Sequence, residues 1–168
     1  MEQRLSTNVS RTIQTKLVLP PDTNHMGTIF GGKILAMIDE IAGIAAMRHS
    51  KSEVVTASID KVNFLSTVKV GDILTFEGFV ISTGRTSMEV YVKVVCEHPD
   101  TGQRRLTTDS FLTMVAVDSS GKPTPVPGVI PETDEEKELY KQALERRQHR
   151  LSAKQARKTE KQICKDNE

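Results

Sequence analysis

Apolar residues follow two different periods along this chain of 168 residues, one typical of a helix and one typical of strands. From residue 29 to residue 48 they recur at helical spacing without a proline, which predicts one long helix. Its apolar positions are Ile34, Leu35, Ile38, Ile41, Ala42, Ala45 and Ala46. Apolar and polar residues then alternate, which predicts strands at 54–60, 74–80, 88–96 and 106–116, with a further strand at 11–19. This order predicts an α+β fold in which a curved antiparallel β-sheet wraps around a long central helix.

Such a sheet leaves one face and its edges uncovered in a single copy. Phe64, Phe79 and Tyr91 lie outside the alternation that fills the helix side of the sheet. Two copies that pair edge to edge would cover both the edge and part of this face. We therefore expect at least a dimer.

One carboxylate interrupts the apolar positions of the predicted helix. Asp39 lies four residues after Leu35 and three before Ala42, so we expect it to share their packed face. Burying an ionised carboxylate without partners is costly, which favours either a catalytic role or a structural one, such as capping a backbone group or pairing with Lys or Arg. Glu40 lies about 100° further round the helix and is expected in solvent or at an interface.

The start of the helix offers unusual backbone groups. Thr28 is a candidate N-cap, and Gly31 and Gly32 in the first turn have no side chains that would keep a ligand from their N–H groups. Such N–H groups have no intrahelical acceptor and lie at the positive end of the helix dipole, which suits a polarised carbonyl or an oxyanion. Tight packing against a strand is the alternative reason for these glycines.

Composition excludes several other classes of protein. The 23 Lys and Arg and 22 Asp and Glu give a net charge of +1, which does not indicate a nucleic-acid-binding protein. No apolar run is long enough to cross a membrane, and the first residues show no apolar signal segment, so we expect a cytoplasmic protein with Cys96 and Cys164 as reduced thiols. The histidines at 25, 49, 98 and 149 show no metal-ligand spacing, so no metal site is expected.

Four segments resemble a known family when they are taken together. They are Asn24–Glu40, Val55–Asp60, Val70–Asp72 and Gly84–Ser87. In this order and spacing, between about Thr12 and Val117, they resemble the hotdog-fold acyl-CoA thioesterases of the bacterial cytoplasmic and brain-type acyl-CoA hydrolase group. The resemblance implies a hotdog fold and hydrolysis of acyl-CoA to a free fatty acid and CoA, with no cofactor besides the CoA thioester substrate. It also implies active sites at a dimer interface and assembly as a trimer of dimers.

The resemblance also assigns roles to residues. It places the catalytic asparagine at Asn24 and the catalytic aspartate at Asp39, contributed by opposite subunits, with Thr56 supporting the water or the carboxylate. The N–H groups of Gly31 and Gly32 would polarise the thioester carbonyl. The residues expected to contact the nucleotide of CoA are Asn63, Arg85, Thr86 and Ser87, with Arg85 as the phosphate partner.

The chemistry of these residue types leaves some alternatives open. Asp39 is suited to act as a general base on water or to attack the carbonyl directly, and the side-chain amide of Asn24 can donate and accept at once. Taken alone, Asn24 is typical of a turn and Thr56 of an ordinary strand. His25 favours a hotdog dehydratase or hydratase as one rival function, and a non-catalytic acyl-CoA-binding regulator is another.

The expected domain organisation is simple. It comprises an N-terminal extension (1–10), a hotdog thioesterase domain (11–120), a Pro-rich linker (121–131) and a charged C-terminal helix or tail (132–168). Thr133 and Glu136 form a capping box at the start of this helix, and Leu139, Ala143 and Leu144 are candidates to dock it. Eight Lys and Arg against one Glu in residues 146–165 predict a solvated basic end. Attraction to CoA phosphates or anionic membranes is the alternative, and no stable membrane association is expected.

Overall fold

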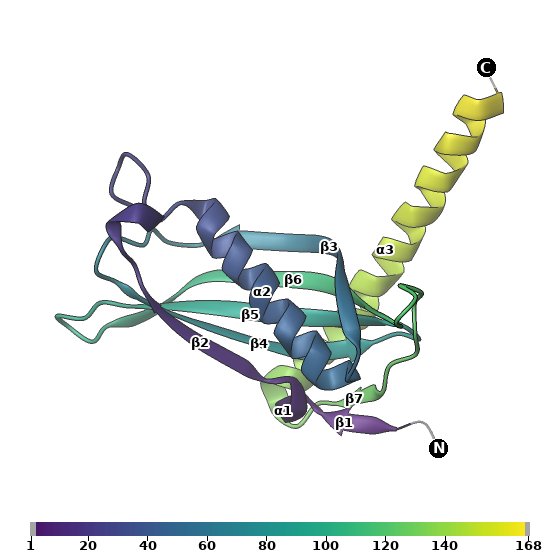
Figure 1. Cartoon of the computed structure of the whole chain (residues 1–168), viewed down its shortest axis with the longest axis horizontal. Helices are drawn as coiled ribbons and strands as arrows, with labels where there is room; N and C mark the ends of the chain where they lie inside the picture. Colours follow the sequence, from purple (N-terminus) through teal and green to yellow (C-terminus); the bar gives the residue numbers. More distant parts are fainter. Residues whose placement is uncertain (1–2, 167–168) are drawn as a thin grey trace.

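A five-stranded antiparallel sheet curves around one long helix, α2 (Gly31–Ser50) (Figure 1). The structure is a computed structural model that describes residues 3–166, apart from the side chains of residues 154 and 157–166. The order across the sheet is β2-β4-β5-β6-β3. The strands are β2 (Thr12–Leu17), β3 (Glu53–Phe64), β4 (Ile73–Thr83), β5 (Ser87–Glu97) and β6 (Arg104–Val117). The predicted α+β architecture is confirmed.

The core forms between one face of α2 and the concave face of the sheet. The buried residues of the helix are Ile34, Ile38, Ile41, Ala42, Ala45, Ala46 and His49. They recur at three- and four-residue intervals, so they form one stripe along the helix. At Gly78 of β4 the helix comes so close that an added Cβ would lie 2.7 Å from Cγ2 of Ile41. A residue without a side chain is therefore required where α2 crosses β4.

The start of α2 differs from the prediction. The N–H of Ile29 donates to the carbonyl of Val68 at 2.8 Å, and Thr28 forms an isolated bridge with Lys69, so both residues are extended. The helix begins at Gly31 and ends at Ser50, and its N-cap is Phe30, which makes no side-chain cap. The prediction that Thr28 is the N-cap was wrong, because the backbone of this segment pairs with a neighbouring loop.

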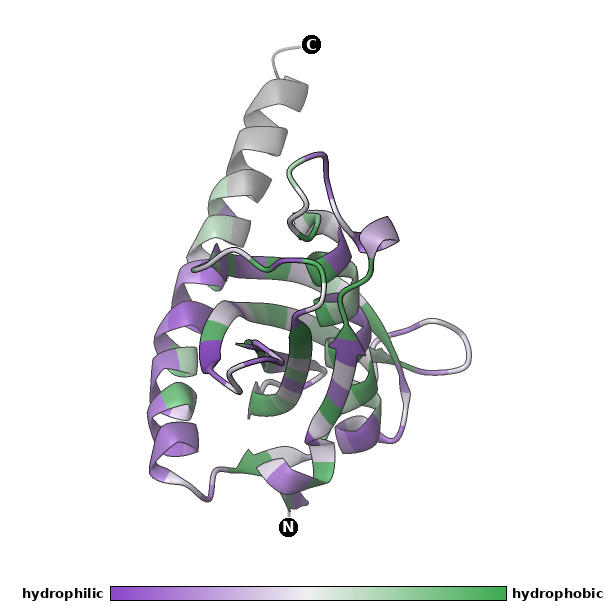
Figure 2. Cartoon of the chain, turned by 90° about the vertical axis from the view of Figure 1, so that its left-hand side faces the viewer, coloured by the Kyte–Doolittle hydropathy of each residue, from purple (hydrophilic) through white to green (hydrophobic). Residues whose placement is uncertain are grey.

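The outer face of the sheet is covered by the first turns of α3 (Asp134–Asp166) (Figure 2), and the helix extends beyond the body of the molecule (Figure 1). A second apolar cluster contains Phe79, Ile81, Tyr91, Phe111, Leu139 and Ala143. Leu139 and Ala143 dock the helix as predicted, whereas Leu144 is exposed. Phe79 and Tyr91 are thus buried by this chain's own helix and need no second copy to cover them.

The basic end of the tail is only partly solvated. The guanidinium of Arg146 bonds Oε1 of Glu89 at 2.5 Å, and that of Arg150 bonds Oε2 at 2.7 Å. The side chain of Glu89 is 2% exposed, so both arginines hold α3 to β5 through a buried carboxylate. The expectation of a solvated basic end was wrong for these two residues. The side chains of Lys154, Arg157, Lys158, Lys161 and Lys165 lie outside the described part of the tail.

The N-terminal segment is fastened to the linker and to α3. It forms β1 (Arg4–Ser6) and the short helix α1 (Thr7–Ser10), and a 3-10 turn (Pro20–Asp22) follows β2. β1 pairs in parallel with β7 (Gly128–Ile130), a pairing that the sequence pattern did not indicate.

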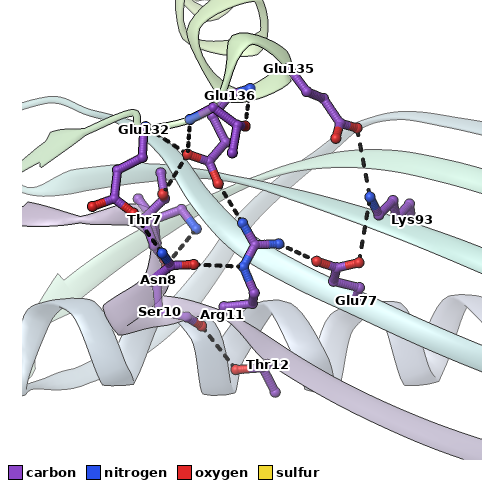
Figure 3. A network of polar contacts seen from close by, with 12 residues as sticks. Thr7, Asn8, Ser10, Arg11, Thr12, Glu77, Lys93, Glu132, Glu135 and Glu136 are labelled. Atoms are coloured by element: carbon purple, nitrogen blue, oxygen red, sulfur yellow. Dashed lines mark hydrogen bonds and ion pairs between the residues drawn. The ribbon is translucent and has the colours of Figure 1, made fainter.

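Glu136 is the centre of this attachment (Figure 3). Its carboxylate accepts bonds from the hydroxyl of Thr7 at 2.8 Å and from the N–H groups of Glu132 at 2.7 Å and Thr133 at 3.1 Å. Arg11 bridges Glu136 and Glu77. The capping box predicted from Thr133 and Glu136 is confirmed, since the N–H of Glu136 also donates to Oγ1 of Thr133.

Glu136→Gln should reduce the free energy of unfolding by about 1–3 kcal/mol at pH 7, because Arg11 and the two N–H groups lose a charged acceptor. Burial opposes ionisation of Glu136, but these N–H groups, Thr7 and Arg11 outweigh it and lower its pKa below the ordinary value of 4.5. The stabilisation is therefore complete above that value and is lost as pH falls through the lower native pKa. Urea denaturation at pH 7 and at about pH 3 should show the difference from wild type shrinking with acidity.

The exposed Glu138→Gln serves as the control for this prediction and should match wild type at both pH values. A Glu136→Gln protein as stable as wild type at neutral pH would show that the carboxylate does not fasten the two termini.

Candidate active site

Asp39 lies beside the buried stripe of α2 rather than within it. Its residue is half-buried, whereas the preceding Ile38 is fully buried. The expectation that it points into the packed face was therefore wrong, because a residue next to Ile38 is turned about 100° away from it around the helix. Oδ1 of Asp39 accepts a hydrogen bond of 2.7 Å from the hydroxyl of Thr56 on β3. In the described part of the chain no Lys or Arg pairs with Asp39, so the structural role of balancing a cation is not supported.

The first turn of α2 presents two free backbone donors. Among the described residues, the N–H groups of Gly31 and Gly32 have no hydrogen-bond acceptor, as their places at the start of the helix require. Gly32 is exposed and Gly31 is half-buried against the ring of Phe64, which would lie 3.5 Å from an added Cβ. These donors can bind a carbonyl oxygen that approaches from the open side of the helix.

Asn24 lies in a tight turn before the helix. Its Oδ1 accepts bonds from the N–H of Met26 at 2.9 Å and from the hydroxyl of Thr28 at 3.1 Å. The turn is closed by the N–H of Asn24, which donates to the carbonyl of Thr28 at 2.9 Å. Within the described chain Nδ2 has no acceptor, so the side-chain amide keeps one donor available while its oxygen fixes the turn. Asn24 makes no hydrogen bond to Asp39 in this chain.

A groove of about 480 Å³ lies beside the helix start. Its lining residues are Thr28, Ile29, Gly31, Ile34, Phe64, Leu65, Ser66, Thr67 and Val68. The sequence pattern did not indicate that segment 65–68 lines this groove, because its residues follow no helical or strand period. Its position depends on backbone hydrogen bonds to the neighbouring strand and to Ile29. The groove is mainly apolar and one of the free N–H groups lies at its edge, which suits a long substrate with a polar centre.

The expected nucleotide contacts lie at two ends of the sheet. Asn63 pairs with Asp109 on β6 and donates to its carboxylate, near the start of α2. Ser87 pairs with Val115 on the same strand, and Arg85 and Thr86 precede it in the β4–β5 turn. Asp109 and Val115 are six residues apart along β6, or about 20 Å in a strand. The four residues therefore do not form one cluster within a single chain: the structure brings Arg85, Thr86 and Ser87 together and places Asn63 apart from them.

Among the side chains that the structure describes, the remaining ionisable groups form no competing catalytic centre. Burial, and then the nearby Asp72 carboxylate, raise the pKa of the Cys96 thiol to about 11, so it is protonated at neutral pH. His25 is exposed, and no carboxylate of the described chain bonds to it. Over residues 3–166, no group of three or more His, Cys, Asp or Glu is placed to hold a metal ion. None of the helices described is long and apolar enough to cross a membrane.

The unpaired edge of β3 lies beside this site. β3 is an edge strand, and its apolar residues Val55, Ile59 and Phe64 are 50%, 37% and 56% exposed. Asp39 and Thr56 therefore lie next to an uncovered strand edge, and Asp39 is eight residues along α2 from Gly31, or about 12 Å.

Comparison with known proteins identifies the family. Residues 26–103 match the model of the thioesterase superfamily. The chain is 49% identical to an uncharacterized acyl-CoA thioester hydrolase of Bacillus subtilis over 86% of this chain and 84% of that protein. The chain belongs to the thioesterase superfamily. A crystal structure of an apo-hexameric acyl-CoA thioesterase has a TM-score of 0.88 and 64% identity, covering 90% of this superfamily member and 97% of that chain.

A further solved relative is the asparagine-to-alanine variant of an acyl-CoA hydrolase of Staphylococcus aureus in complex with coenzyme A, with a TM-score of 0.86 and 43% identity over 93% of this chain and 96% of that one. That enzyme was also solved as variants in which an aspartate or a threonine was changed to alanine. The three positions have the same spacing along that chain as Asn24, Asp39 and Thr56 have here.

Proposed function

We propose that this thioesterase superfamily member hydrolyses acyl-CoA to a free carboxylic acid and CoA. The observation that carries the proposal is the half-buried carboxylate of Asp39, held by the Thr56 hydroxyl at 2.7 Å with no cation paired to it among the described residues. A carboxylate in this setting is oriented but not neutralised, so it remains able to accept a proton or to attack a carbonyl carbon. The relatives named as acyl-CoA hydrolases support the substrate class.

In the proposed reaction, the thioester carbonyl lies against the N–H groups of Gly31 and Gly32, which stabilise the negative charge that develops on its oxygen. Asp39 takes a proton from a water molecule that attacks the carbonyl carbon, or attacks that carbon itself to give a mixed anhydride that water then hydrolyses. In both routes the carbon–sulfur bond breaks, and the thiolate of CoA leaves and gains a proton. Asn24 orients the water or the carbonyl with Nδ2.

We further propose that each site forms between two copies and that Asn24 and Asp39 come from different subunits. Asn24 and Asp39 are not bonded within one chain, and the exposed apolar edge of β3 lies beside Asp39, which supports edge-to-edge pairing. The hexameric structure of a relative supports a trimer of dimers as the full assembly. A cytoplasmic location stays a prediction.

Release of free thiol from a series of acyl-CoA esters of rising chain length tests the activity. In the same assay, Thr56→Val should lower kcat by about tenfold, because Asp39 loses its orienting hydrogen bond, while Thr56→Ser should keep most of the activity. Absence of thiol release from every ester would overturn the proposed function. Equal activity of the valine and serine variants would remove Thr56 from the mechanism.

A further inference from the structure

A basic side chain from the C-terminal helix reaches the β4–β5 turn. A Cβ added to Gly84 would lie 3.0 Å from Nη2 of Arg147 and 2.8 Å from Oγ of Ser87. The guanidinium of Arg147 and the hydroxyl of Ser87 therefore flank the same glycine, whose missing side chain leaves room for them. Arg147 lies outside residues 26–103, which match the family model, so it is not among the positions that this model matches.

Arg147 differs from Arg146 and Arg150 on α3, because it has no acidic partner among the residues that the structure describes. Arg146 and Arg150 both bond the carboxylate of Glu89, and Arg150 also bonds Asp60 at 3.2 Å. Among the described residues, neither Arg147 nor Arg85 of the turn forms an ion pair. Two arginines from separate elements thus meet at this turn, Arg85 through its backbone and Arg147 through its guanidinium, and neither has an ion-pair partner in the described part of the chain.

The position of Arg147 is fixed by the residues around it. The Arg146 guanidinium lies 4.0 Å from the centre of the Phe111 ring, and Leu139 and Ala143 pack in the cluster beneath the helix. Arg150, one turn further on, ties the same stretch of α3 to Glu89. Arg147 is therefore held at the turn by contacts that do not involve its own side chain.

The turn itself is anchored by its backbone. The carbonyl of Arg85 accepts a bond from the N–H of Val126 at 3.0 Å, and that of Thr86 accepts one from Ala116 at 3.0 Å. Within the described chain, the hydroxyls of Thr86 and Ser87 donate to no protein acceptor. The side chains of the turn are thus available to a ligand while its backbone is held in place.

We propose that Arg147 joins Arg85, Thr86 and Ser87 in binding the phosphate groups of the nucleotide part of acyl-CoA. Guanidinium groups bind phosphate oxygens in a planar, two-pronged geometry, and hydroxyls supply further donors. Ser87 pairs with Val115 and Val115 with Val55, the neighbour of Thr56, so the turn lies at the Thr56 end of the sheet. This inference rests on the proposed function, since it assigns a site to part of the same substrate.

The test compares two esters of the same acyl group, one of CoA and one of pantetheine, which has no phosphate. Arg147→Gln should raise KM for the CoA ester about tenfold and leave kcat unchanged. KM for the pantetheine ester should stay at the wild-type value. The increase in KM should be smaller at high salt. It should also be smaller in Arg147→Lys, which keeps the positive charge but loses the planar, two-pronged hydrogen-bonding geometry of the guanidinium. A CoA ester without its 3′-phosphate shows which phosphate is bound.

Lys141→Gln is the matched control, because it removes one positive charge from an exposed position on α3. It should leave KM for both esters unchanged. An unchanged KM in Arg147→Gln, or an equal rise for both esters, would overturn the proposed phosphate site. If the wild-type protein cleaved neither ester, the proposed function would fail. Calorimetric titration of CoA would still test the site then, since equal affinity of wild type and Arg147→Gln would contradict it.

Discussion

Asp39→Ala should lower kcat for acyl-CoA hydrolysis by about 10³-fold, with KM within about threefold of wild type. Both routes open to Asp39 need its carboxylate, as a base toward water or as the attacking group. The bond from Thr56 shows that the carboxylate is held in one orientation, so the loss falls on the chemical step rather than on substrate binding. Initial rates of thiol release across a range of acyl-CoA concentrations would separate kcat from KM.

Glu40→Gln is the control for this variant, because Glu40 is the adjacent carboxylate and is exposed. It should retain wild-type rates, since it takes no part in the Thr56 contact. An Asp39→Ala protein with more than about a tenth of wild-type kcat would contradict a direct role of the carboxylate. Label found in Asp39 after a single turnover in water labelled with heavy oxygen would establish covalent attack, because water adds to the Asp39 carboxyl only through a mixed anhydride.

Asn24→Ala and Asp39→Ala proteins, each almost inactive alone, should regain activity when their subunits are mixed. In a dimer with one copy of each variant, one site would carry both substitutions and the other would carry neither. Random pairing would restore about a quarter of the wild-type sites in the unselected mixture, and about half of them in dimers that contain one copy of each variant. Co-expression with two different affinity tags, followed by rate measurement on the doubly purified protein, would test this.

The control for this prediction is a mixture of Asp39→Ala subunits with Thr56→Val subunits. Asp39 and Thr56 are bonded within one chain, so both residues belong to the same site. In a mixed dimer, the site with Asp39→Ala is inactive. The other site carries only Thr56→Val and keeps the reduced rate of that variant. A mixture of Asn24→Ala and Asp39→Ala that stayed inactive would show that both residues serve the same site from one subunit.

Much of the fold followed from the sequence because its elements are long and strongly periodic. The apolar stripe of α2 and the alternation of β4, β5 and β6 are local patterns, and each element needs only its own residues to be recognised. The parallel pair of β1 and β7 has three residues in each strand, too few to show a period. The docking of α3 through Arg146 and Arg150 depends on one buried acid, Glu89, which looks like any polar strand position in the sequence.

The candidate site was predictable in its residue types but not in its arrangement. Spacing along α2 indicated that Asp39 was unusual, and the resemblance suggested Thr56 as support for the water or the carboxylate. The structure supplied the hydrogen bond between Thr56 and Asp39 and the half-buried position of Asp39. The separation of Asn63 from Arg85 depends on strand register, which only the paired sheet reveals. Arg147 lies in a run of basic residues that is typical of a solvated surface, so nothing in the pattern distinguished it from Arg146.

The close approach at Gly78 has a consequence for a part of the molecule that it does not touch. Ile41 lies two residues from Asp39 on the same rigid helix, and Val92 confines Gly78 from the neighbouring strand at 3.3 Å from an added Cβ. Any side chain at this position would force α2 to lift from β4. The carboxylate of Asp39 would then move relative to Thr56 on the opposite edge of the sheet. The smallest residue of β4 thus acts as a spacer that sets the alignment of a pair of groups several strands away.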